Sequence, residues 1–168
     1  MKSLLVLDQK DYTDDMPVHE KYSVRAIICR NGKYAMQMSG AGKYKIPGGC
    51  VEKGEDLLDA LAREVQEETG LLILRDSIRE IGEITELRRD VFDESTKYVC
   101  HSLFYYCDVS DEVTATSMTE SEIAKGYHPV WADLDTILSA NEELLHTHWT
   151  KRDTLFLTML RDGFTTKG

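Results

Sequence analysis

Three glutamates in the stretch REVQEETG, residues 63–70, have a spacing at which a helix would bring them together. Glu67 and Glu68 follow Glu64 by three and four positions, so the side chains would share one helix edge and repel one another. The preceding segment IPGG would bring bare backbone carbonyls beside that edge. Clustered carboxylates and a carbonyl are the hard-oxygen ligands that Mg²⁺ and Mn²⁺ prefer, and a bound cation would remove the repulsion. The pattern indicates either a divalent-metal site or, more plainly, a solvated acidic helix face.

The element that carries these glutamates is predicted to be a helix over Glu55–Thr69. Its buried face would consist of apolar residues at helical spacing, namely Leu58, Leu61, Ala62 and Val65. Acids in the first turn suit the positive end of the helix dipole, and Gly70 favours a stop. With about 100° of rotation per residue, the glutamates fall near the border of the buried face. The helix would therefore hold the carboxylates beside the core, with Arg63 placed to pair with Glu67.

The segment GCVEKGEDLLDALAREVQEETGL, residues 49–71, resembles the complete signature motif of the Nudix hydrolases (MutT-like proteins). Every fixed position of that motif is matched, by Gly49, Glu55, Arg63, Glu64, Val65, Glu67, Glu68, Gly70 and Leu71. The resemblance implies an α/β fold, the Nudix-type α/β/α sandwich with a mixed central sheet. We expect one such domain over residues 1–168.

The resemblance also implies a metal-dependent hydrolase that cleaves a pyrophosphate bond in a nucleoside diphosphate linked to another moiety. The implied ligands for Mg²⁺ or Mn²⁺ are Glu64, Glu67, Glu68 and the carbonyl of Gly48 or Gly49. Arg63 and Glu55 resemble the pair that orients these glutamates in the family, and with Glu64 and Glu67 they form the expected catalytic set. Such a cation would screen phosphate charge, activate a water and stabilise the leaving oxyanion.

Three functions are compatible with this resemblance. Within the hydrolase reading, a modified nucleoside triphosphate is slightly favoured over ADP-ribose or another nucleoside-diphosphate sugar, because the chain is compact and has no evident N-terminal dimerisation domain. The alternative is a non-catalytic Nudix-fold sensor of a nucleotide or other ligand, against which the complete motif argues. A metal-dependent isomerase on the same fold would need cysteine and glutamate roles that we cannot place in this sequence.

The sequence departs from part of the family at the strand containing Val130 and Trp131. Some members that cleave nucleoside triphosphates carry a carboxylate before this aromatic residue, where this chain has Val130. A last acid would then come from the segment TESE, as Glu120 or Glu122, although both are also compatible with a solvated loop. Substrate phosphates or a base could be contacted by basic residues near the glycine-rich turn or on a strand, namely Lys43, Lys45, Arg88 and Arg89.

The flanking segments are typical of strands and helices in irregular alternation. Strands are predicted over residues 1–8, 79–89, 95–110 and 128–134, and a hairpin over residues 22–39 around Asn31-Gly32. Helices are predicted near Leu134–Ser139 and over Thr150–Leu160, whereas the Ser/Thr/Glu-rich residues 113–126 are predicted to form a loop. This alternation favours a mixed sheet with helices on both faces.

Several other reactive or aromatic side chains are predicted to be structural. His146 and His148 would point apart on a helix, so we do not expect them to bind a metal. We interpret His101 as a satisfied sheet residue and Trp131 as a core residue. Core packing is favoured over base stacking for the strand aromatics Tyr98, Phe104, Tyr105 and Tyr106. GAGKY lacks a glycine and the Ser/Thr that a phosphate-binding P-loop requires.

Charge and cysteine content limit the partners. The net charge is −10, which argues against binding to a nucleic-acid polymer or an anionic membrane and leaves a small-molecule nucleotide as the expected partner. No segment approaches the length of a membrane span. Because the four cysteines are widely spaced, we expect reduced thiols in or near the core of a cytoplasmic protein. A homodimer is compatible with the sequence.

Overall fold

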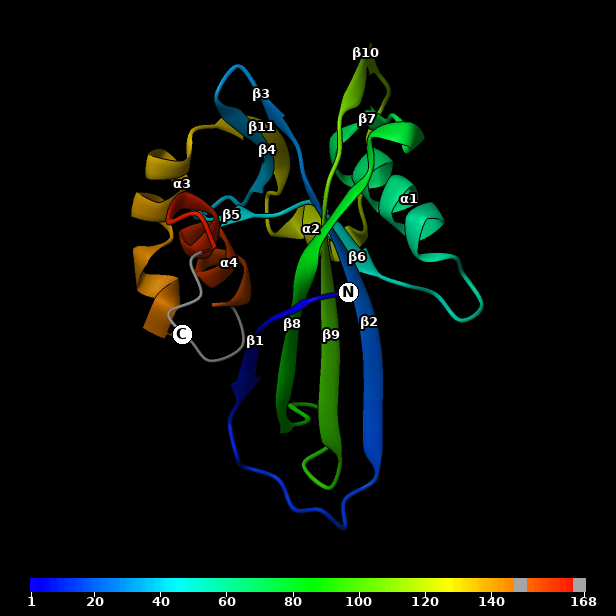
Figure 1. Ribbon diagram of the computed structural model, residues 1–168, viewed down its shortest axis with the longest axis vertical. Coiled ribbons are helices and arrows are strands. Elements are labelled where there is room, and N and C mark those ends of the chain that lie inside the picture. Colours follow the sequence, from blue (N-terminus) through cyan, green and yellow to red (C-terminus); the bar gives the residue numbers. More distant parts are fainter. Residues whose placement is uncertain (147–150, 165–168) are drawn as a thin grey trace.

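The computed structural model describes residues 1–146 and 151–164. Its largest sheet is mixed, with antiparallel pairs β8–β9 and β2–β6 and parallel pairs β1–β8 and β2–β9. The strand order is β1 (Ser3–Asp8), β8 (Arg79–Arg89), β9 (Lys97–Tyr106), β2 (Val18–Ile27) and β6 (Gly48–Cys50). The long strands β2, β8 and β9 lie side by side and extend beyond the helices at one end of the molecule (Figure 1).

Two smaller sheets complete the strands. One has the order β11 (His128–Ala132), β4 (Lys33–Met38) and β3 (Cys29–Arg30), and β5 (Tyr44–Lys45) also pairs with β4. The other joins β10 (Val109–Val113) to β7 (Leu71–Ile73). Between β3 and β4, Asn31 and Gly32 have φ angles of 52° and 75°, as the predicted tight hairpin turn requires.

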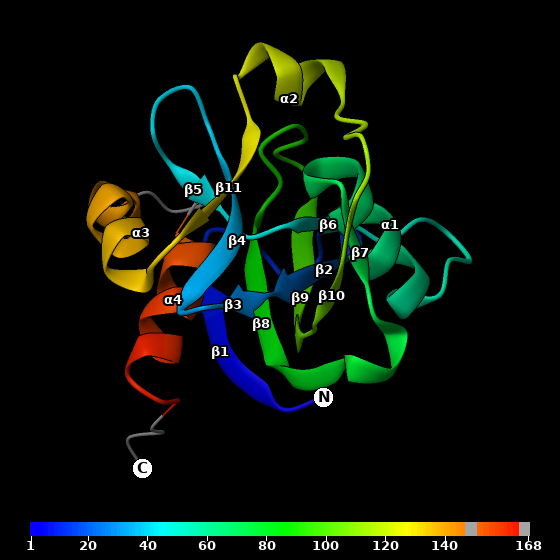
Figure 2. The same cartoon turned by 90° about the horizontal axis from the view of Figure 1, so that it is seen from above.

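Helices cover both faces of the large sheet. One face packs against α1 (Leu57–Thr69), and the other packs against α3 (Leu134–Ala140) and α4 (Arg152–Arg161) (Figure 1). The short helix α2 (Glu120–Ala124) lies at the rim, with β5 to one side and α1 to the other (Figure 2). Single turns of 3-10 helix span Arg75–Ser77 and Glu142–His146. This arrangement confirms the predicted α/β class with a mixed sheet.

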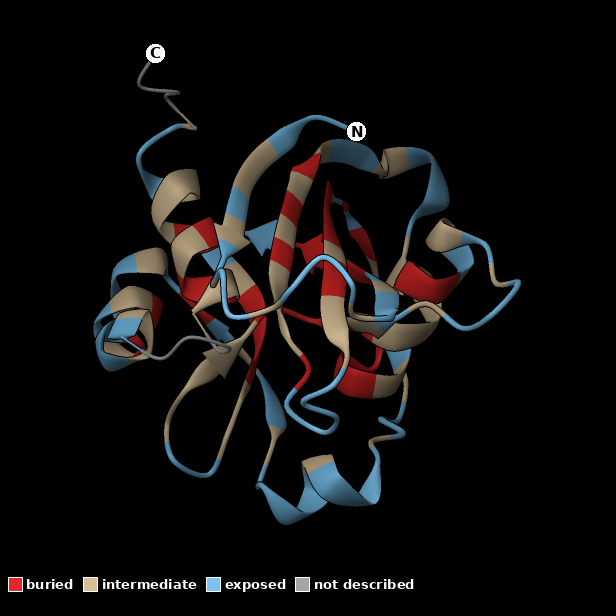
Figure 3. Ribbon diagram, turned by 90° about the horizontal axis from the view of Figure 1, so that it is seen from below, coloured by how far each residue is buried: buried red, intermediate tan, exposed pale blue. Residues whose placement is uncertain are grey.

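The core consists of two clusters, one on each face of the sheet. Beneath α1, Val24 and Leu103 of the sheet pack with Leu61 and Val65 of the helix. On the opposite face, Phe104 stacks on Phe156 of α4 with a distance of 3.8 Å between ring centroids. Buried residues alternate with half-buried ones along β8 (Figure 3), whereas β2 and β9 contain continuous buried runs where helices cover both faces. The two clusters fix α1 and α4 on either side of β2 and β9.

The helix that carries the glutamates begins later than predicted. It starts at Leu57, because the carboxylate of Asp56 accepts hydrogen bonds from the amides of Leu58 and Asp59 and so caps the first turn. Glu55 therefore lies outside the helix. The end is as predicted, since Gly70 adopts a left-handed φ of 73° directly after Thr69.

The predicted loop over residues 113–126 was wrong in part, because it contains α2. Thr119 and Glu122 form a reciprocal capping box, in which each side chain bonds the backbone N–H of the other residue. The predicted strand over residues 95–110 is divided into β9 and β10. The last helix spans Arg152–Arg161 rather than Thr150–Leu160, and Thr150 and His148 lie outside the described residues.

Some residues predicted to be in the core are exposed. Trp131 is 37% exposed, and its ring is contacted by the guanidinium of Arg30. Tyr106 is 40% exposed, whereas Phe104 and Tyr105 are buried as expected. The prediction for the thiols was also wrong in part, since Cys29 and Cys50 are exposed while Cys100 and Cys107 are buried. All four thiols are free.

His101 is a bonded sheet residue, as predicted. Its two ring nitrogens each lie 2.6 Å from a carboxylate, Nδ1 from Glu83 and Nε2 from Glu20.

In the described part of the chain, no helix is long and apolar enough to cross a membrane.

Candidate active site

The segment from β5 to β6 approaches the glutamate-bearing helix with bare backbone. A Cβ atom added to Gly49 would lie 2.6 Å from the carboxylate of Glu64. Gly48 has a φ of 144°, and a Cβ there would lie 1.9 Å from the carbonyl oxygen of Val24. Any side chain at either position would displace the helix edge or β2. The two glycines therefore allow the carboxylates of α1 to lie directly against the backbone of β6.

Arg63 binds three of the acids that the sequence singled out. Its guanidinium contacts Glu55 at 2.7 Å, Glu64 at 3.0 Å and Glu67 at 3.3 Å, and Nη2 also donates to the carbonyl of Cys50. The hydrogen bonds from Arg63 lower the pKa of Glu55 to about 2. Because Glu55 holds two guanidinium nitrogens, Arg63 is fixed where it orients the other two carboxylates.

Glu68 is the buried acid of the cluster, with only 2% of its side chain exposed. Its Oε2 accepts a hydrogen bond of 2.8 Å from the amide of Gly48, and its Oε1 lies 3.1 Å from the ammonium of Lys45. Burial raises the pKa of the Glu68 carboxyl to about 7, although Lys45 and the Gly48 amide act in the opposite direction. Burial likewise raises the pKa of Glu64, against the effect of Arg63. At both carboxylates, the effect of burial on the pKa exceeds that of the neighbouring positive charge.

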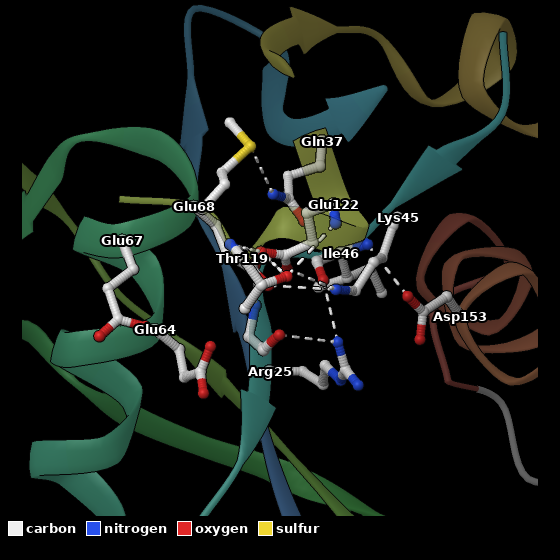
Figure 4. Close-up of polar contacts among 12 residues, drawn as sticks. Arg25, Gln37, Lys45, Ile46, Glu64, Glu67, Glu68, Thr119, Glu122 and Asp153 are labelled. Atoms are coloured by element: carbon white, nitrogen blue, oxygen red, sulfur yellow. Dashed lines mark hydrogen bonds and ion pairs between the residues drawn. The ribbon is translucent and has the colours of Figure 1, made fainter. Parts of the chain in front are cut away.

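Glu122 of α2 approaches the same place from the other side. Its Oε1 lies 3.9 Å from the Lys45 ammonium, so Lys45 connects α2 to Glu68 (Figure 4). Burial raises the pKa of the Glu122 carboxyl, but hydrogen bonds from Thr119 and the charge of Lys45 outweigh it, and the net pKa is lowered. Of the two acids proposed from TESE, Glu122 is thus brought to the cluster, whereas Glu120 is exposed.

The donor set has the chemistry of a Mg²⁺ or Mn²⁺ site. Every candidate ligand is a hard oxygen, from the carboxylates of Glu64, Glu67, Glu68 and Glu122 or from the Gly48 carbonyl. Among residues 1–146 and 151–164, however, no three acidic, histidine or cysteine side chains are arranged to hold a metal ion. Arg63 and Lys45 lie on these carboxylates instead. The residues fit a divalent cation in type and charge, provided that at least one of the bound side-chain cations withdraws.

A cavity of about 490 Å³ adjoins Lys45. One wall comes from residues before and within β5, and the other from the segment that follows α2 and from α4. Its lining includes Lys43, Tyr44, Lys45, Lys125, Tyr127 and Arg152. The two rims meet through their backbones: Gly40 donates to the carbonyl of Lys125 at 2.9 Å, and a Cβ on Gly126 would lie 3.1 Å from the Cα of Gly40. Aromatic and cationic side chains together suit a ligand that has both an unsaturated ring and an anionic group.

Arg88 and Arg89 are placed differently from the other predicted substrate contacts. The guanidinium of Arg88 lies over the ring of Tyr98, 4.0 Å from its centroid, and Arg89 donates to the carbonyl of Asp11. Among the described contacts, none ties either arginine to the glutamates. Lys45, in contrast, contacts both the cluster and the cavity.

Two buried residues that support the site were missed by the sequence reading. Arg25 of β2 donates to the carbonyls of Ile46 and Gly48, and Asp153 of α4 accepts from the amide of Ile46 at 3.0 Å. Together, these contacts from β2 and α4 fix the backbone of the segment between Lys45 and Gly49. The signal for Arg25 was a charge inside the otherwise apolar run YSVRAIIC, whereas the sequence around Asp153 gives no comparable signal.

Comparisons with known proteins identify the family of this chain. A family model described as the NUDIX domain matches residues 20–153. A MutT-like protein from Streptomyces ambofaciens is 26% identical over 122 residues, which is 72% of this chain and 72% of that protein. An uncharacterized Nudix hydrolase from Bacillus subtilis is 28% identical over 102 residues, 61% of this chain and 58% of its own length.

Solved structures show the same fold at low sequence identity. A NUDIX hydrolase from Nitrosomonas europaea has a TM-score of 0.63 at 21% identity, covering 86% of this chain and 90% of the other. A MutT NUDIX hydrolase from Burkholderia pseudomallei has a TM-score of 0.53 at 19% identity, covering 70% of this chain and 85% of the other.

Proposed function

Since the chain belongs to the Nudix family and is a Nudix pyrophosphohydrolase, we propose that its substrate is a nucleoside diphosphate linked to another moiety. A modified nucleoside triphosphate is the first candidate, followed by ADP-ribose or another nucleoside-diphosphate sugar. The observation that carries the proposal is the buried Glu68, which is bonded by the Gly48 amide and by Lys45, a residue that also lines a cavity with tyrosines and other cations. A nucleotide has the ring and the phosphates for which this lining is suited.

The proposed metal site uses the carboxylates of α1. Glu64, Glu67, Glu68 and the Gly48 carbonyl would hold Mg²⁺ or Mn²⁺, which would supply phosphate charge neutralisation and an activated water. Arg63 would orient Glu64 and Glu67, and Glu55 would hold Arg63, because these contacts are already made. A single guanidinium would thus set the positions of two proposed metal ligands, Glu64 and Glu67.

Proton transfer requires a carboxylate beside this cluster. We assign it to Glu122, which approaches the cluster from α2 with its Oε1 3.9 Å from the Lys45 ammonium. Its position is set by the capping box at the start of α2. Lys45, which lines the cavity, would bind phosphate oxygens of the substrate.

Two further proposals concern the extent of the domain and the location of the protein. We propose that residues 1–168 form one Nudix domain, because β1 pairs with β8 and α4 contributes Phe156 and Leu157 to the core. We also propose a cytoplasmic location, which the four free thiols support.

The test is incubation with a nucleotide panel and Mg²⁺, with products assayed before and after phosphatase treatment. Release of pyrophosphate from a modified nucleoside triphosphate would support the first candidate, and release of a sugar phosphate would support the second. Tight nucleotide binding without turnover of any panel member would contradict the proposed hydrolysis.

A further inference from the structure

Lys45 lies where two functions of the proposed site would compete for one side chain. Its ammonium is 3.1 Å from Glu68 and 3.9 Å from Glu122, so it occupies the space between the helix α1 and the helix α2 (Figure 4). The same side chain is 28% exposed and lines the cavity, with its ammonium 5.8 Å from the ring centroid of Tyr127. Lys45 therefore borders both the carboxylates and the space for substrate.

The contact with Glu68 compensates a charge that could not remain buried alone. A buried carboxylate must be paired, protonated or bound to a cation. A divalent ion on Glu68 would repel an ammonium within a few ångströms, so metal binding weakens the contact between Lys45 and this carboxylate. Lysine is a compact charge on a flexible stem with several rotatable bonds, and its Cα stays in place when the ammonium turns towards the cavity.

Arg63 is the other cation on the cluster, and it is held much more firmly. Glu55 binds its Nε at 2.7 Å and its Nη2 at 2.9 Å, and the Cys50 carbonyl accepts a further hydrogen bond. These contacts would persist when Glu64 and Glu67 turn to a metal. Of the two, Lys45 is the side chain free to leave.

We propose that Lys45 is an exchangeable counter-cation: it pairs with Glu68 beside Glu122 in the metal-free protein, is displaced by the divalent ion, and then binds phosphate oxygens in the adjoining cavity. The inference rests on the proposed function, since it takes Glu68 as a metal ligand and a diphosphate as the ligand. The exchange couples metal binding to phosphate binding. Each ligand favours the position of Lys45 in which its ammonium has left Glu68, so each raises the affinity for the other.

The exchange predicts effects of opposite sign for the variant Lys45→Gln. Without the competing charge, Mn²⁺ alone should bind about tenfold more tightly, since one repulsive ammonium is lost near the site. With Mn²⁺ saturating, imidodiphosphate should bind about tenfold more weakly, since a charge-assisted hydrogen bond is lost. A lysine that only supports the fold would weaken both.

Both affinities can be measured by calorimetry on the full chain, with Lys43→Gln as the matched control. Lys43 carries the same charge and lines the same cavity, but it binds the Ala140 carbonyl and Glu143. Its variant should leave the Mn²⁺ affinity within about twofold of the wild type, because surface charges at a distance are screened. Equal or weaker Mn²⁺ binding by Lys45→Gln would overturn the exchange.

A second measurement needs no variant. Acylation of lysines by an N-hydroxysuccinimide ester, followed by mass spectrometry, should show Lys45 reacting several-fold faster once Mn²⁺ is saturating, whereas the exposed Lys53 serves as an internal reference. Unchanged Lys45 reactivity at saturating Mn²⁺ would overturn the proposal. If the nucleotide panel is cleaved while these tests fail, the exchange is wrong and the hydrolase stands. If Lys45 responds to Mn²⁺ but no panel nucleotide is cleaved, the exchange stands and the proposed substrate class is wrong.

Discussion

Glu68 and Asp153 are buried carboxylates on either side of the segment that joins β5 to β6, and their surroundings shift their pKa values in opposite directions (Figure 4). Asp153 accepts from the amide of Ile46, and Glu68 accepts from the amide of Gly48. Burial disfavours ionisation of both. At Asp153 the guanidinium groups of Arg152 and Arg25 outweigh burial and lower the pKa, whereas at Glu68 burial prevails and the pKa rises to about 7.

The difference lies in the cations that each carboxylate has permanently beside it. Arg152 contacts Asp153 at 2.9 Å and Glu86 at 3.2 Å, and these two nearly buried acids hold its guanidinium in place. Glu68 contacts a flexible lysine that it shares with Glu122, whereas Arg25 acts on Glu68 through its charge alone. Burial of an acid alone therefore does not indicate a cation site, whereas burial without a fixed cation in contact favours one. Asp153 is thus held by fixed guanidinium groups, and the looser pairing of Glu68 supports its proposed role as a metal ligand.

The largest expected effect is on turnover in Glu68→Gln. Residues that only support metal ligands cost about 10–100-fold when replaced, so loss of a direct ligand should lower kcat/KM by more than about 100-fold. The rate is measured with Mg²⁺ on whichever panel nucleotide is cleaved. Glu112→Gln, an exposed change on β10, is the control and should retain the wild-type rate. A wild-type rate in Glu68→Gln would remove this residue from the metal site.

Replacing Asp153 should cost more folding stability than replacing Glu68, although Glu68 is expected to matter more for turnover. Asp153→Asn leaves Arg152 with less compensation in the interior, and the free energy of unfolding should fall by about 3 kcal/mol. In Glu68→Gln without metal, the free energy of unfolding should stay equal or rise, because an undercompensated buried charge is removed. Urea denaturation in the presence of a chelator measures both. Equal losses in the two variants would contradict the distinction drawn here.

The pH dependence of stability should separate the two acids again. The Glu68 pKa is raised from 4.5 to about 7, so the folded state binds the proton more tightly than the unfolded state. Metal-free wild type should therefore lose stability relative to Glu68→Gln as pH rises from about 4.5 to about 7, and the difference should then level off. Asp153 has a lowered pKa, so its contribution should be present above its ordinary pKa and lost only as the pH falls below it. Urea midpoints across this range are the measurement, and a flat difference for Glu68→Gln would exclude the raised pKa.

The smallest effect should come from the helix that carries Glu122. Thr119→Ala removes the side-chain half of the capping box and should destabilise α2 by about 1 kcal/mol. Because α2 is short and lies at the rim, global unfolding should change little, while the rate falls a few-fold through misplacement of Glu122. Thr119→Ser preserves the hydroxyl and should restore the rate. If Thr119→Ala matches wild type in rate, the position of Glu122 does not limit turnover.

The local part of this site could be predicted from sequence, and the long-range part could not. Glu55, Arg63, Glu64 and Glu67 lie within one motif, where helical spacing and short turns determine which groups meet. The contacts of Lys45 with Glu122, and of Ile46 with Asp153, join residues far apart in the chain and depend on how α2 and α4 pack.

The misassigned segments had different physical causes. Helix α2 carried a readable signal in the spacing of Thr119 and Glu122, but the surrounding polar residues favoured a loop. Trp131 alternates with buried Ala132 along β11, and only the position of that strand in its sheet determines that the ring faces outward beside Arg30.

The backbone contact between Gly40 and Lys125 has a consequence for altering the specificity of this protein. The segments on either side of the cavity meet without an intervening side chain, so lengthening one would push against the other. Loop grafts or random insertions on a single side should therefore mostly impair folding of the rim, whereas compensating changes on both sides could widen it. Laboratory selection for new substrates is best begun from paired libraries covering residues 39–43 and 125–127 together.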